Sequence, residues 1–334
     1  MDFYGITYLV QLENNDDGGG DDNDTDGIVN LTVHAWSGGN EASRRSEEMV
    51  LRAIVGYAVD RYTPEYAIVS GGSTRLVGVN VGLGNGNAIE ANGPVDFSAA
   101  TVPGKVTSTG AIVPQRPTDL PSASKRNIPT IVPASYAYLT TYTLKGGIYG
   151  GQVWLTGGGK ITDILPFKGW TWNGNMWRYA GNFPINDAND SFYSETNVEI
   201  YGSFGTFANP WSLTLLSAGY IDVTGQPSIK ALAGGISLMA GTDLRLRGPS
   251  NIYEWGLYAA REQIQLEDNP VIHGVLLAAD IEDIGILIGR ATNANMDYVG
   301  NISISYDGNL TTELIDGTPY VKIFGFKKDF TPNE

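Results

Sequence analysis

The chain has no cysteine and only two histidines among its 334 residues. Without cysteine it can form neither a disulfide nor a thiolate, which excludes thiol catalysis and cysteine metal sites. His34 and His273 alone give little support to a histidine zinc site or a histidine-containing catalytic triad. We therefore expect no required cofactor that depends on these residue types. The lack of cysteine leaves the compartment open, because it suits exported prokaryotic and cytosolic proteins alike.

Apolar runs and positive charge are also scarce. No run of about 18 apolar residues predicts a membrane-spanning helix, and Met1-Asp2-Phe3-Tyr4 has no signal-peptide pattern. Because the chain opens directly on a strand-like run, we expect an N-terminal anchor upstream of it. The 21 Lys and Arg against 36 Asp and Glu give a net charge of −15, which repels phosphate polymers and argues against DNA as a partner.

Glycine is abundant, with 43 residues beside 16 prolines and a hydrophobic content of 42%. This composition is typical of short strands separated by turns, with enough apolar surface for a core. Residues 3–12 and 28–36 are β-rich and flank an acidic, Gly-rich loop, so they predict a hairpin. Residues 43–62 fit both a capped helix and a strand, and we favour the strand.

The clearest signal is a repeat that begins at Val198. Four segments carry an apolar-x-apolar pair followed by a turn, and they start 23, 23 and 20 residues apart. The segments are Val198–Gly202, Ile221–Gly225, Leu244–Gly248 and Ile264–Asp268. Small-residue corners that end in Gly219, Gly241 and Ala260 recur at a similar spacing. Two features in register indicate a coiled chain of short strands rather than chance.

Repeats of this length with inward-outward alternation predict a solenoid, in which each coil buries its inner residues against its neighbours. A further short strand, Asn269–Gly274, precedes Val275–Ala279 and implies three strands per coil. The predicted fold is mainly β: a right-handed parallel β-helix with an N-terminal hairpin region and an aromatic-rich insertion. Evenly spaced strands also suit a β-sandwich, which is the alternative.

Changes in composition divide the chain into five regions. They are a β-rich N-terminal region (1–66), the first coils with a Pro-rich crossing loop (67–135), the aromatic and Gly-rich insertion (136–190), the main β-helix (191–312), and a C-terminal strand and tail (313–334).

Three stretches carry a resemblance to a known family: NVEIYGSFGTFANPWSLTLLSAGYIDVTGQPSI, GLYAAREQIQLEDNPVIHGVLLAADIED and GNISISYDGNL. They resemble the β-helix region of PilX-like and related minor pilins, with their Ala-Gly corner, Gly-x-Pro turn and His-Gly strand. Upstream, HAWSGGNEASRRSEEMVLRAI followed by PEYAIVSGG resembles the passage from the pilin-like part into the solenoid. The resemblance covers residues 28–312.

The resemblance implies export and incorporation into, or attachment to, a type IV pilus-like filament, with pilin subunits as partners. The family's N-terminal hydrophobic helix is not in this chain. We predict an extracellular, non-enzymatic structural or adhesive protein at the cell surface. Two alternatives stay open, a polysaccharide-binding or -cleaving β-helix protein and a DNA-binding, competence-type minor pilin.

Two motifs are candidate binding sites. Asp22, Asp24 and Asp26 fit Asp-x-Asp-x-Asp-Gly, whose carboxylates can converge on Ca²⁺, although Val33 stands where a complete EF-hand loop has Glu. The alternative is a solvated hairpin tip. The stretch WTWNGNMWRY combines aromatic faces with a cation, as sites for sugars or bases do, or else docks the insertion by packing. Its candidate residues are Trp170, Trp172, Trp177, Arg178 and Tyr179.

Charged residues also recur within the repeat. Glu199, Asp222, Arg245 and Gln265 occupy the same place in successive repeats, so a solenoid would stack them in an outward file about 5 Å apart. Carboxylates so placed can cleave glycosidic bonds, but such a file is more often a solvated face with weak ion pairs. His273, in Val-Ile-His-Gly, is expected to be a hydrogen-bonded turn residue.

Overall fold

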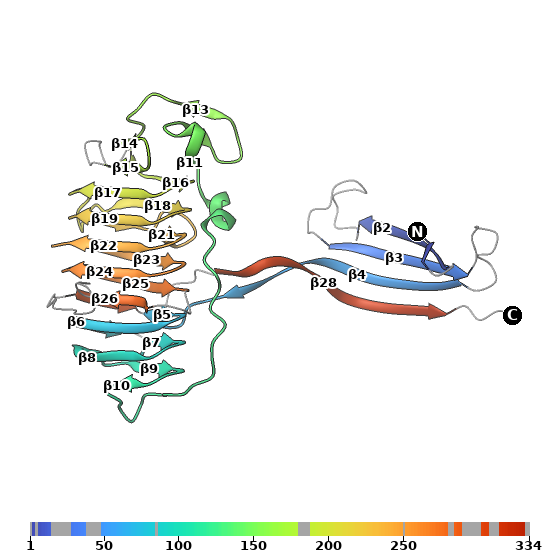
Figure 1. Ribbon diagram of the computed structural model, residues 1–334, viewed down its shortest axis with the longest axis horizontal. Coiled ribbons are helices and arrows are strands. Elements are labelled where there is room, and N and C mark those ends of the chain that lie inside the picture. Colours follow the sequence, from blue (N-terminus) through green and yellow to red (C-terminus); the bar gives the residue numbers. More distant parts are fainter. Residues whose placement is uncertain are drawn as a thin grey trace. The chain divides into compact units, whose positions relative to one another are not determined.

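The computed structural model describes residues 2–3, 6–14, 28–37, 48–83, 86–179, 188–249, 251–279, 284–288, 302–306 and 314–330. The chain divides into two compact units (Figure 1). A small sheet unit combines Met1–Arg61 with Ile315–Glu334, and a solenoid unit comprises Tyr62–Leu314. Along the chain, the solenoid is therefore an insertion between two parts of the sheet unit. The C-terminal region, predicted as a separate strand and tail, belongs with the N-terminal region.

The sheet unit is one five-stranded sheet. Its order is β1 (Asp2–Phe3), β2 (Ile6–Asn14), β3 (Ile28–Ser37), β4 (Glu48–Tyr62) and β28 (Leu314–Phe330). β2 and β3 form the predicted antiparallel hairpin, with Leu9 opposite His34. β4 continues the sheet with Val50 opposite His34, so the ambiguous stretch is a strand, as favoured. Runs of β-branched residues suit this pleated surface.

The solenoid unit has about nine turns, and each full coil contributes to three parallel sheets. Sheet one contains β11 (Tyr142–Leu144), β16 (Asp190–Ser194), β18 (Trp211–Ser217), β21 (Ile236–Ala240), β23 (Ile252–Ala260), β25 (Val271–Ala278), β5 (Ile68–Ser70), β7 (Asn87–Ala91) and β9 (Lys105–Ser108). Sheet two contains β15 (Trp177–Tyr179), β17 (Val198–Gly202), β19 (Ile221–Gly225), β22 (Leu244–Gly248), β24 (Ile264–Asp268), β26 (Ile284–Ile288), β6 (Ser73–Leu83), β8 (Val95–Thr101) and β10 (Ile112–Val113). Sheet three contains β20 (Ser228–Lys230), β27 (Ile302–Tyr306), the starts of β18, β23 and β25, and the ends of β6 and β8. This confirms the predicted parallel β-helix.

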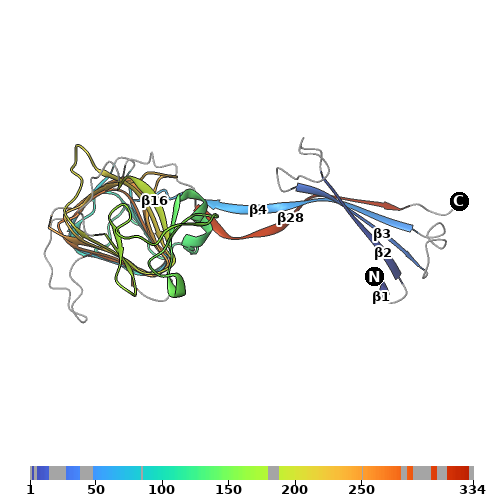
Figure 2. The same cartoon turned by 90° about the horizontal axis from the view of Figure 1, so that it is seen from above.

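The order of the coils differs from the order of the chain. The chain enters at β5 and β6, winds through β10 to one end, crosses to the other end and winds back from β11 to β27 (Figure 1). The last strands then stack on the first: Leu276 of β25 pairs with Ile68 of β5, and Ile304 of β27 pairs with Val81 of β6. The two ends of the solenoid segment thus meet inside the stack. Seen along the solenoid axis, the coils superimpose around one interior (Figure 2).

The predicted repeats are confirmed residue by residue on sheet two. Val198, Ile221, Leu244 and Ile264 are register partners on consecutive strands, and all four side chains are fully buried. The strands end in a stacked Gly202, Gly225, Gly248 and Asp268. Gly248 has φ +139°, and a Cβ there would collide with the carbonyl oxygen of Gly225. The turn glycines are therefore required by both backbone conformation and space.

Small residues form a column at the end of sheet one. The column is Ser194, Ser217, Ala240, Ala260, Ala278, Ser70, Ala91 and Ser108. Its serines donate hydrogen bonds to corner carbonyls, as Ser217 does to Thr196 at 2.8 Å and Ser108 to Gly93 at 2.8 Å. The column passes without interruption from Ala278 to Ser70, so the corner chemistry is the same where the two ends of the segment meet. The predicted corners are present, but their alignment differs from the prediction. Ala260 pairs with Ala240 rather than with Gly241, and Ala240 pairs with Ser217.

The Pro-rich segment predicted as a crossing loop has no helix or named strand from residue 114 to 132. It runs along the outside of sheet one. Asn92 binds both backbone groups of Arg126, at 2.8 and 2.9 Å, and η2 (Pro133–Leu139) then packs against β16 and β18. Leu216 and Met239 are register partners on this sheet. Their side chains point away from the interior of the coils, yet both are fully buried. We call residues 113–135 the crossing segment.

The aromatic-rich insertion closes one end of the stack. β12 (Val153–Leu155) and β13 (Lys160–Thr162) form antiparallel pairs beyond β11, and β14 (Trp170–Trp172) pairs antiparallel with β15. β11 and β15 themselves stack in parallel on the main coils, so the insertion is continuous with the solenoid. It also contains η3 (Gly147–Tyr149). Among the described residues, no helix is long and apolar enough to cross a membrane.

Candidate functional site

The outward face of sheet two carries the predicted file of polar side chains. The pairing register aligns Glu199, Asp222, Arg245 and Gln265 on β17, β19, β22 and β24. Arg178 of β15 extends the file by one strand beyond the prediction. A second file beside it contains Thr224 and Arg247. Because every strand ends at the same stacked turn, the side chains keep constant spacing along the file.

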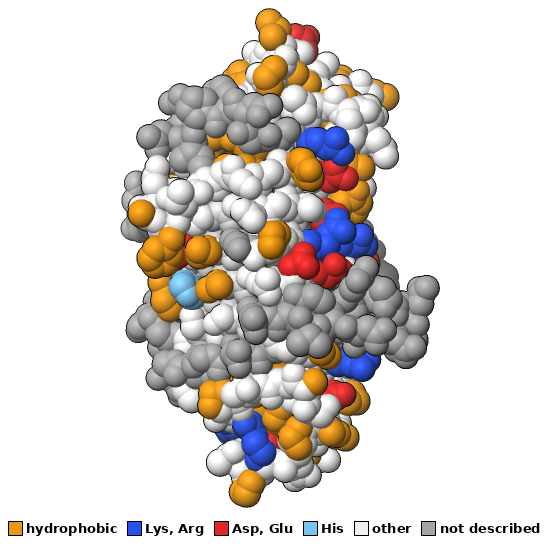
Figure 3. All heavy atoms as spheres, turned by 90° about the vertical axis from the view of Figure 1, so that its left-hand side faces the viewer, with side chains coloured by type: hydrophobic (Ala, Val, Ile, Leu, Met, Phe, Trp, Pro, Cys, Tyr) orange, Lys and Arg blue, Asp and Glu red, His pale blue; other side chains and the backbone are white. Residues whose placement is uncertain are grey.

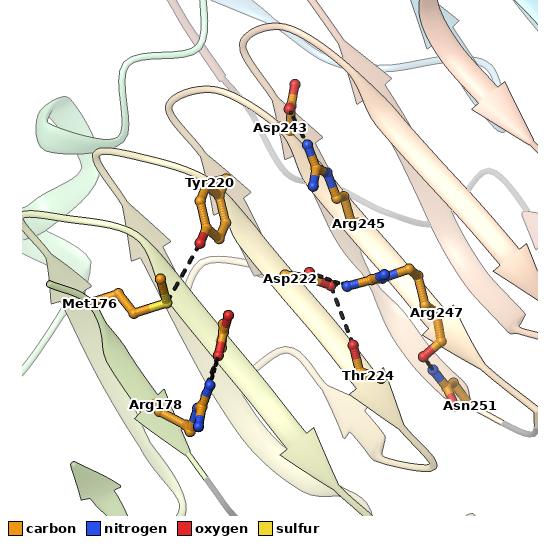
Figure 4. Close-up of polar contacts among 10 residues, drawn as sticks. Met176, Arg178, Tyr220, Asp222, Thr224, Asp243, Arg245, Arg247 and Asn251 are labelled. Carbon is orange, nitrogen blue, oxygen red and sulfur yellow. Dashed lines mark hydrogen bonds and ion pairs between the residues drawn. The ribbon is translucent and has the colours of Figure 1, made fainter. Parts of the chain in front are cut away.

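The arginines of this face bind its carboxylates (Figure 4). Arg178 Nε donates to Glu199 Oε2 at 2.9 Å, and Arg247 Nε donates to Asp222 Oδ1 at 3.0 Å. Arg247 Nη2 also binds Asp222 Oδ2, so this pair is bidentate. These contacts join neighbouring strands, and bidentate geometry is the strongest form of the arginine–carboxylate bond.

Tyr220 stands at the corner of the same face. Its hydroxyl donates to Met176 Sδ at 3.5 Å, and the guanidinium of Arg245 lies 5.9 Å from its ring centre. Arg245 also binds Asp243 at 3.1 Å. Burial raises the pKa of Tyr220, and the negative charges of Glu199 and Asp222 raise it further. The phenol is therefore a hydrogen-bond donor of this surface at neutral pH.

The ion pairs bear on the chemistry that this face can perform. Glycoside hydrolysis uses one carboxyl group to donate a proton and a second to attack or to activate water. Here Glu199, Asp222 and Asp243 are each bound by an arginine. In the structure these carboxylates accept hydrogen bonds from guanidinium groups. The arrangement suits a fixed polar surface that offers paired charges.

The predicted aromatic ligand site is divided between the core and the surface. Trp170, Trp177 and Tyr179 are fully buried, and Tyr179 stacks on Trp211 with 4.3 Å between ring centres. Trp170 meets Tyr179 edge to face at 5.4 Å. These three rings have no exposed face on which a sugar or base could stack, so the ligand-binding role is corrected to packing. Such pairs stabilise a core beyond the area that they bury.

The other two predicted ligand-binding residues lie nearer to solvent. Trp172 is half-buried beside Trp177, with 5.6 Å between ring centres. A Cβ on Gly150 would collide with the Trp172 ring, so a glycine pair packs against this indole. Arg178 is exposed and bound to Glu199. Neither forms a joint site with the three buried rings.

Asp22, Asp24 and Asp26 lie outside the described residues. Calcium binding by that loop stays a prediction. Within the described ranges, no group of three or more His, Asp or Glu is arranged to hold a metal ion.

Trp255, which is 46% exposed, was not among the residues predicted from the sequence. It lies on β23, and its ring stacks on that of His273 on β25. His273 is thus a strand residue rather than the predicted turn residue. A usable signal was present in NIYEWGLYAA. There, Trp-Gly interrupts a strand pattern, which is typical of a β-bulge.

No protein-family model and no curated protein matches the chain. Among solved structures, the chain is similar to the competence-associated pilin ComZ from Thermus thermophilus. The two are 9% identical, the match covers 98% of this chain and 84% of that chain, and the TM-score is 0.37.

Proposed function

We propose that the protein is a non-enzymatic component of a type IV pilus-like filament, exported to the cell surface, where it acts by presenting the surface of its solenoid. The observation that carries this proposal is the chain topology. The solenoid unit, Tyr62–Leu314, is inserted between the two chain segments that build the sheet unit. A large unit is thereby added to a small sheet without separating the strands of that sheet.

The sheet unit supplies the filament contact in this proposal. It is formed from both ends of the chain, with β28 beside β4, so a partner that binds it holds the solenoid segment at both ends. Partners of this unit are pilin subunits or other filament components. The resemblance of residues 28–312 to PilX-like and related minor pilins supports the same assignment.

The charged face of sheet two supports a presenting role over a catalytic one. Its arginines and carboxylates are bound to one another across strands, as Arg247 is to Asp222. Paired charges on a repetitive backbone make a surface whose shape changes little on binding, and preorganised surfaces lose less entropy in association. A structural or adhesive component benefits from this rigidity.

The test is immunogold labelling of cells that express the full-length protein in its source organism. Antibodies against the chain are expected to label surface filaments, and the protein is expected in the fraction of filaments sheared from cells. The matched control is a strain without the pilus assembly machinery, in which both signals are expected to disappear. Surface label that persists in that strain, or a protein found only inside the cells, would contradict the proposal.

A further inference from the structure

A β-bulge on sheet three sets Trp255 apart from the regular coil pattern. β23 and β25 pair in parallel, with Tyr253 opposite Ile272 and Gly256 opposite Gly274. Two residues of β23, Glu254 and Trp255, therefore stand opposite one residue of β25, His273. This is a β-bulge with one extra residue on β23. Tyr253 and Leu257 on either side are fully buried. The bulge turns a large aromatic residue outward between two core residues, and bulges occur frequently beside functional sites.

The indole of Trp255 is held against an imidazole. The rings of Trp255 and His273 are stacked with 5.4 Å between centres and 28° between planes. Trp255 is 46% exposed, so a large part of the indole remains open to solvent. The space-filling view shows a histidine side chain bordered by hydrophobic side chains on one face of the molecule (Figure 3).

Glu254, beside the Trp255–His273 pair, has a carboxylate oxygen without a hydrogen-bond donor. Its Oε2 lies 3.5 Å from Nδ1 of His273, whereas its Oε1 is buried and has no hydrogen-bond partner. The side chain of Glu254 is only 14% exposed. A buried carboxylate oxygen without a donor is costly, and native structures usually supply one. Glu254 thus places a largely buried negative charge directly beside the imidazole of His273.

Further polar side chains share the same register column. Lys230 of β20 pairs with Glu254, and His273 pairs with Ser305 of β27. An ammonium, a carboxylate, an imidazole and a hydroxyl thus follow one another on adjacent strands, beside the exposed indole. Register partners of a parallel sheet lie about 5 Å apart, which is near the width of one sugar ring.

The local backbone fixes this arrangement before any ligand arrives. Tyr258 donates its hydroxyl to the carbonyl oxygen of Glu254 at 2.7 Å. A Cβ on Gly256 would lie 3.1 Å from Cβ of Ser237 and 3.3 Å from Cβ of Ala231, so the bulge packs tightly against the previous coil. A site held in this way loses little freedom on binding.

We propose that Trp255, His273 and Glu254 form a carbohydrate-binding site for a pyranose ring. A pyranose has an apolar face of C–H groups that can pack on an indole, and a rim of hydroxyls that both donate and accept hydrogen bonds. Trp255 provides the platform, and His273 and Lys230 offer polar groups beside the indole for the hydroxyls of the sugar. Glu254 contacts His273 from the same register column and holds the imidazole in place. A phosphate-bearing ligand suits the site poorly, because Glu254 and the net charge of −15 repel it. This inference does not depend on the filament assignment.

Ligand-observed saturation-transfer NMR on the whole chain tests the proposal, with cellobiose, lactose and N,N′-diacetylchitobiose as probes. At least one disaccharide is expected to bind, with the strongest transfer to the C–H protons of one ring face. Trp255→Ala is expected to weaken binding about tenfold or more, and Glu254→Gln to weaken it less. Tyr201→Ala is the matched control, because Tyr201 is an exposed aromatic residue, at 62%, on sheet two.

Thermal unfolding of each variant shows whether it is folded. Should Trp255→Ala fail to fold, Trp255→Phe and Glu254→Gln take its place, and both are expected to weaken binding while the fold is kept. Absence of binding by all three disaccharides overturns the proposal. So does equal binding by the wild type and the folded variants, or a loss of binding in Tyr201→Ala as large as that in Trp255→Ala. Filament labelling is unaffected in every case, so failure here leaves the proposed function to its own test.

Discussion

Arginine–carboxylate pairs occur both in the crossing segment and on the face of sheet two, but in different surroundings. The crossing segment uses Arg116 with Asp119 and Arg126 with Glu90, at 2.8 Å each, and the carboxylate side chains are 0% and 6% exposed. On sheet two, Glu199 is 27% exposed and Asp243 is 24% exposed. The distances differ little, whereas the burial differs several-fold. Burial of the carboxylate, rather than the existence of a pair, should therefore decide what each pair contributes to stability.

The largest effect is expected for Arg116→Ala. Arg116 binds Asp119 through two nitrogens, donates to the carbonyl oxygens of Val102 and Gly104, and lies over the ring of Phe97. Its removal leaves the buried Asp119 without its cation. We expect the free energy of unfolding to fall by about 3 kcal/mol in urea denaturation. Arg178→Ala, which breaks an exposed pair, is the control, and an equal loss in both variants would refute the comparison.

A smaller loss is expected for Arg126→Ala. The Arg126 side chain is 59% exposed, and burial already raises the pKa of Glu90, so Glu90 can take up a proton when its partner is removed. We expect a loss of about 2 kcal/mol and faster proteolytic cleavage within residues 113–132. Lys125→Ala is the control, because Lys125 is the exposed neighbouring residue. It should change neither the free energy of unfolding nor the rate of proteolytic cleavage. Unchanged proteolysis of Arg126→Ala would mean that this pair does not hold the crossing segment.

The two buried carboxylates should respond to pH in opposite directions. Burial alone would raise the pKa of Asp119, but the hydrogen bonds and charge of Arg116 outweigh it and lower that pKa. The Asp119 contribution is therefore present above about pH 4 and lost as the pH falls. The pKa of Glu90 is raised by burial, more than Arg126 lowers it. The Glu90 contribution is therefore present below about pH 4 and lost as the pH rises.

Two variants isolate these opposite slopes. The stability advantage of the wild type over Asp119→Asn should shrink as the pH falls from about 5 to about 3. Its advantage over Glu90→Gln should shrink as the pH rises from about 4 to about 7. Urea unfolding at several pH values measures both. Slopes of the same sign would show that the two pairs are in equivalent environments.

The sequence predicted the parts of the fold that are encoded locally. Val198, Ile221, Leu244 and Ile264 are register partners because the apolar pair and its turn glycine recur with each coil. Nothing in the chain marks Leu276 of β25 as the partner of Ile68, since every coil offers similar aliphatic residues. The entry of the chain into the middle of the stack was therefore not predictable from local pattern.

In the candidate site, too, the features encoded by local sequence pattern were predicted and the others were not. The outward file from Glu199 to Gln265 was predicted, since its members alternate with core residues. The burial of Trp170 and Tyr179 was not, because an Asn- and Gly-rich stretch of aromatic residues has the same composition at a surface and at a capping core. Trp255 was missed, since a bulge breaks the alternation that pattern analysis depends on.

The smallest effect is expected for Glu199→Gln on sheet two. Arg178 is 47% exposed and can be hydrated when its partner loses charge, so the free energy of unfolding should fall by less than about 1 kcal/mol. Asp222→Asn is the comparator on the same face, because the Asp222 side chain is 12% exposed and takes a bidentate contact from Arg247. We expect a loss of about 1–2 kcal/mol for that variant, between the exposed and the buried pairs. If Glu199→Gln destabilised the chain as much as Asp222→Asn, alignment along the file rather than burial would set the strength of these pairs.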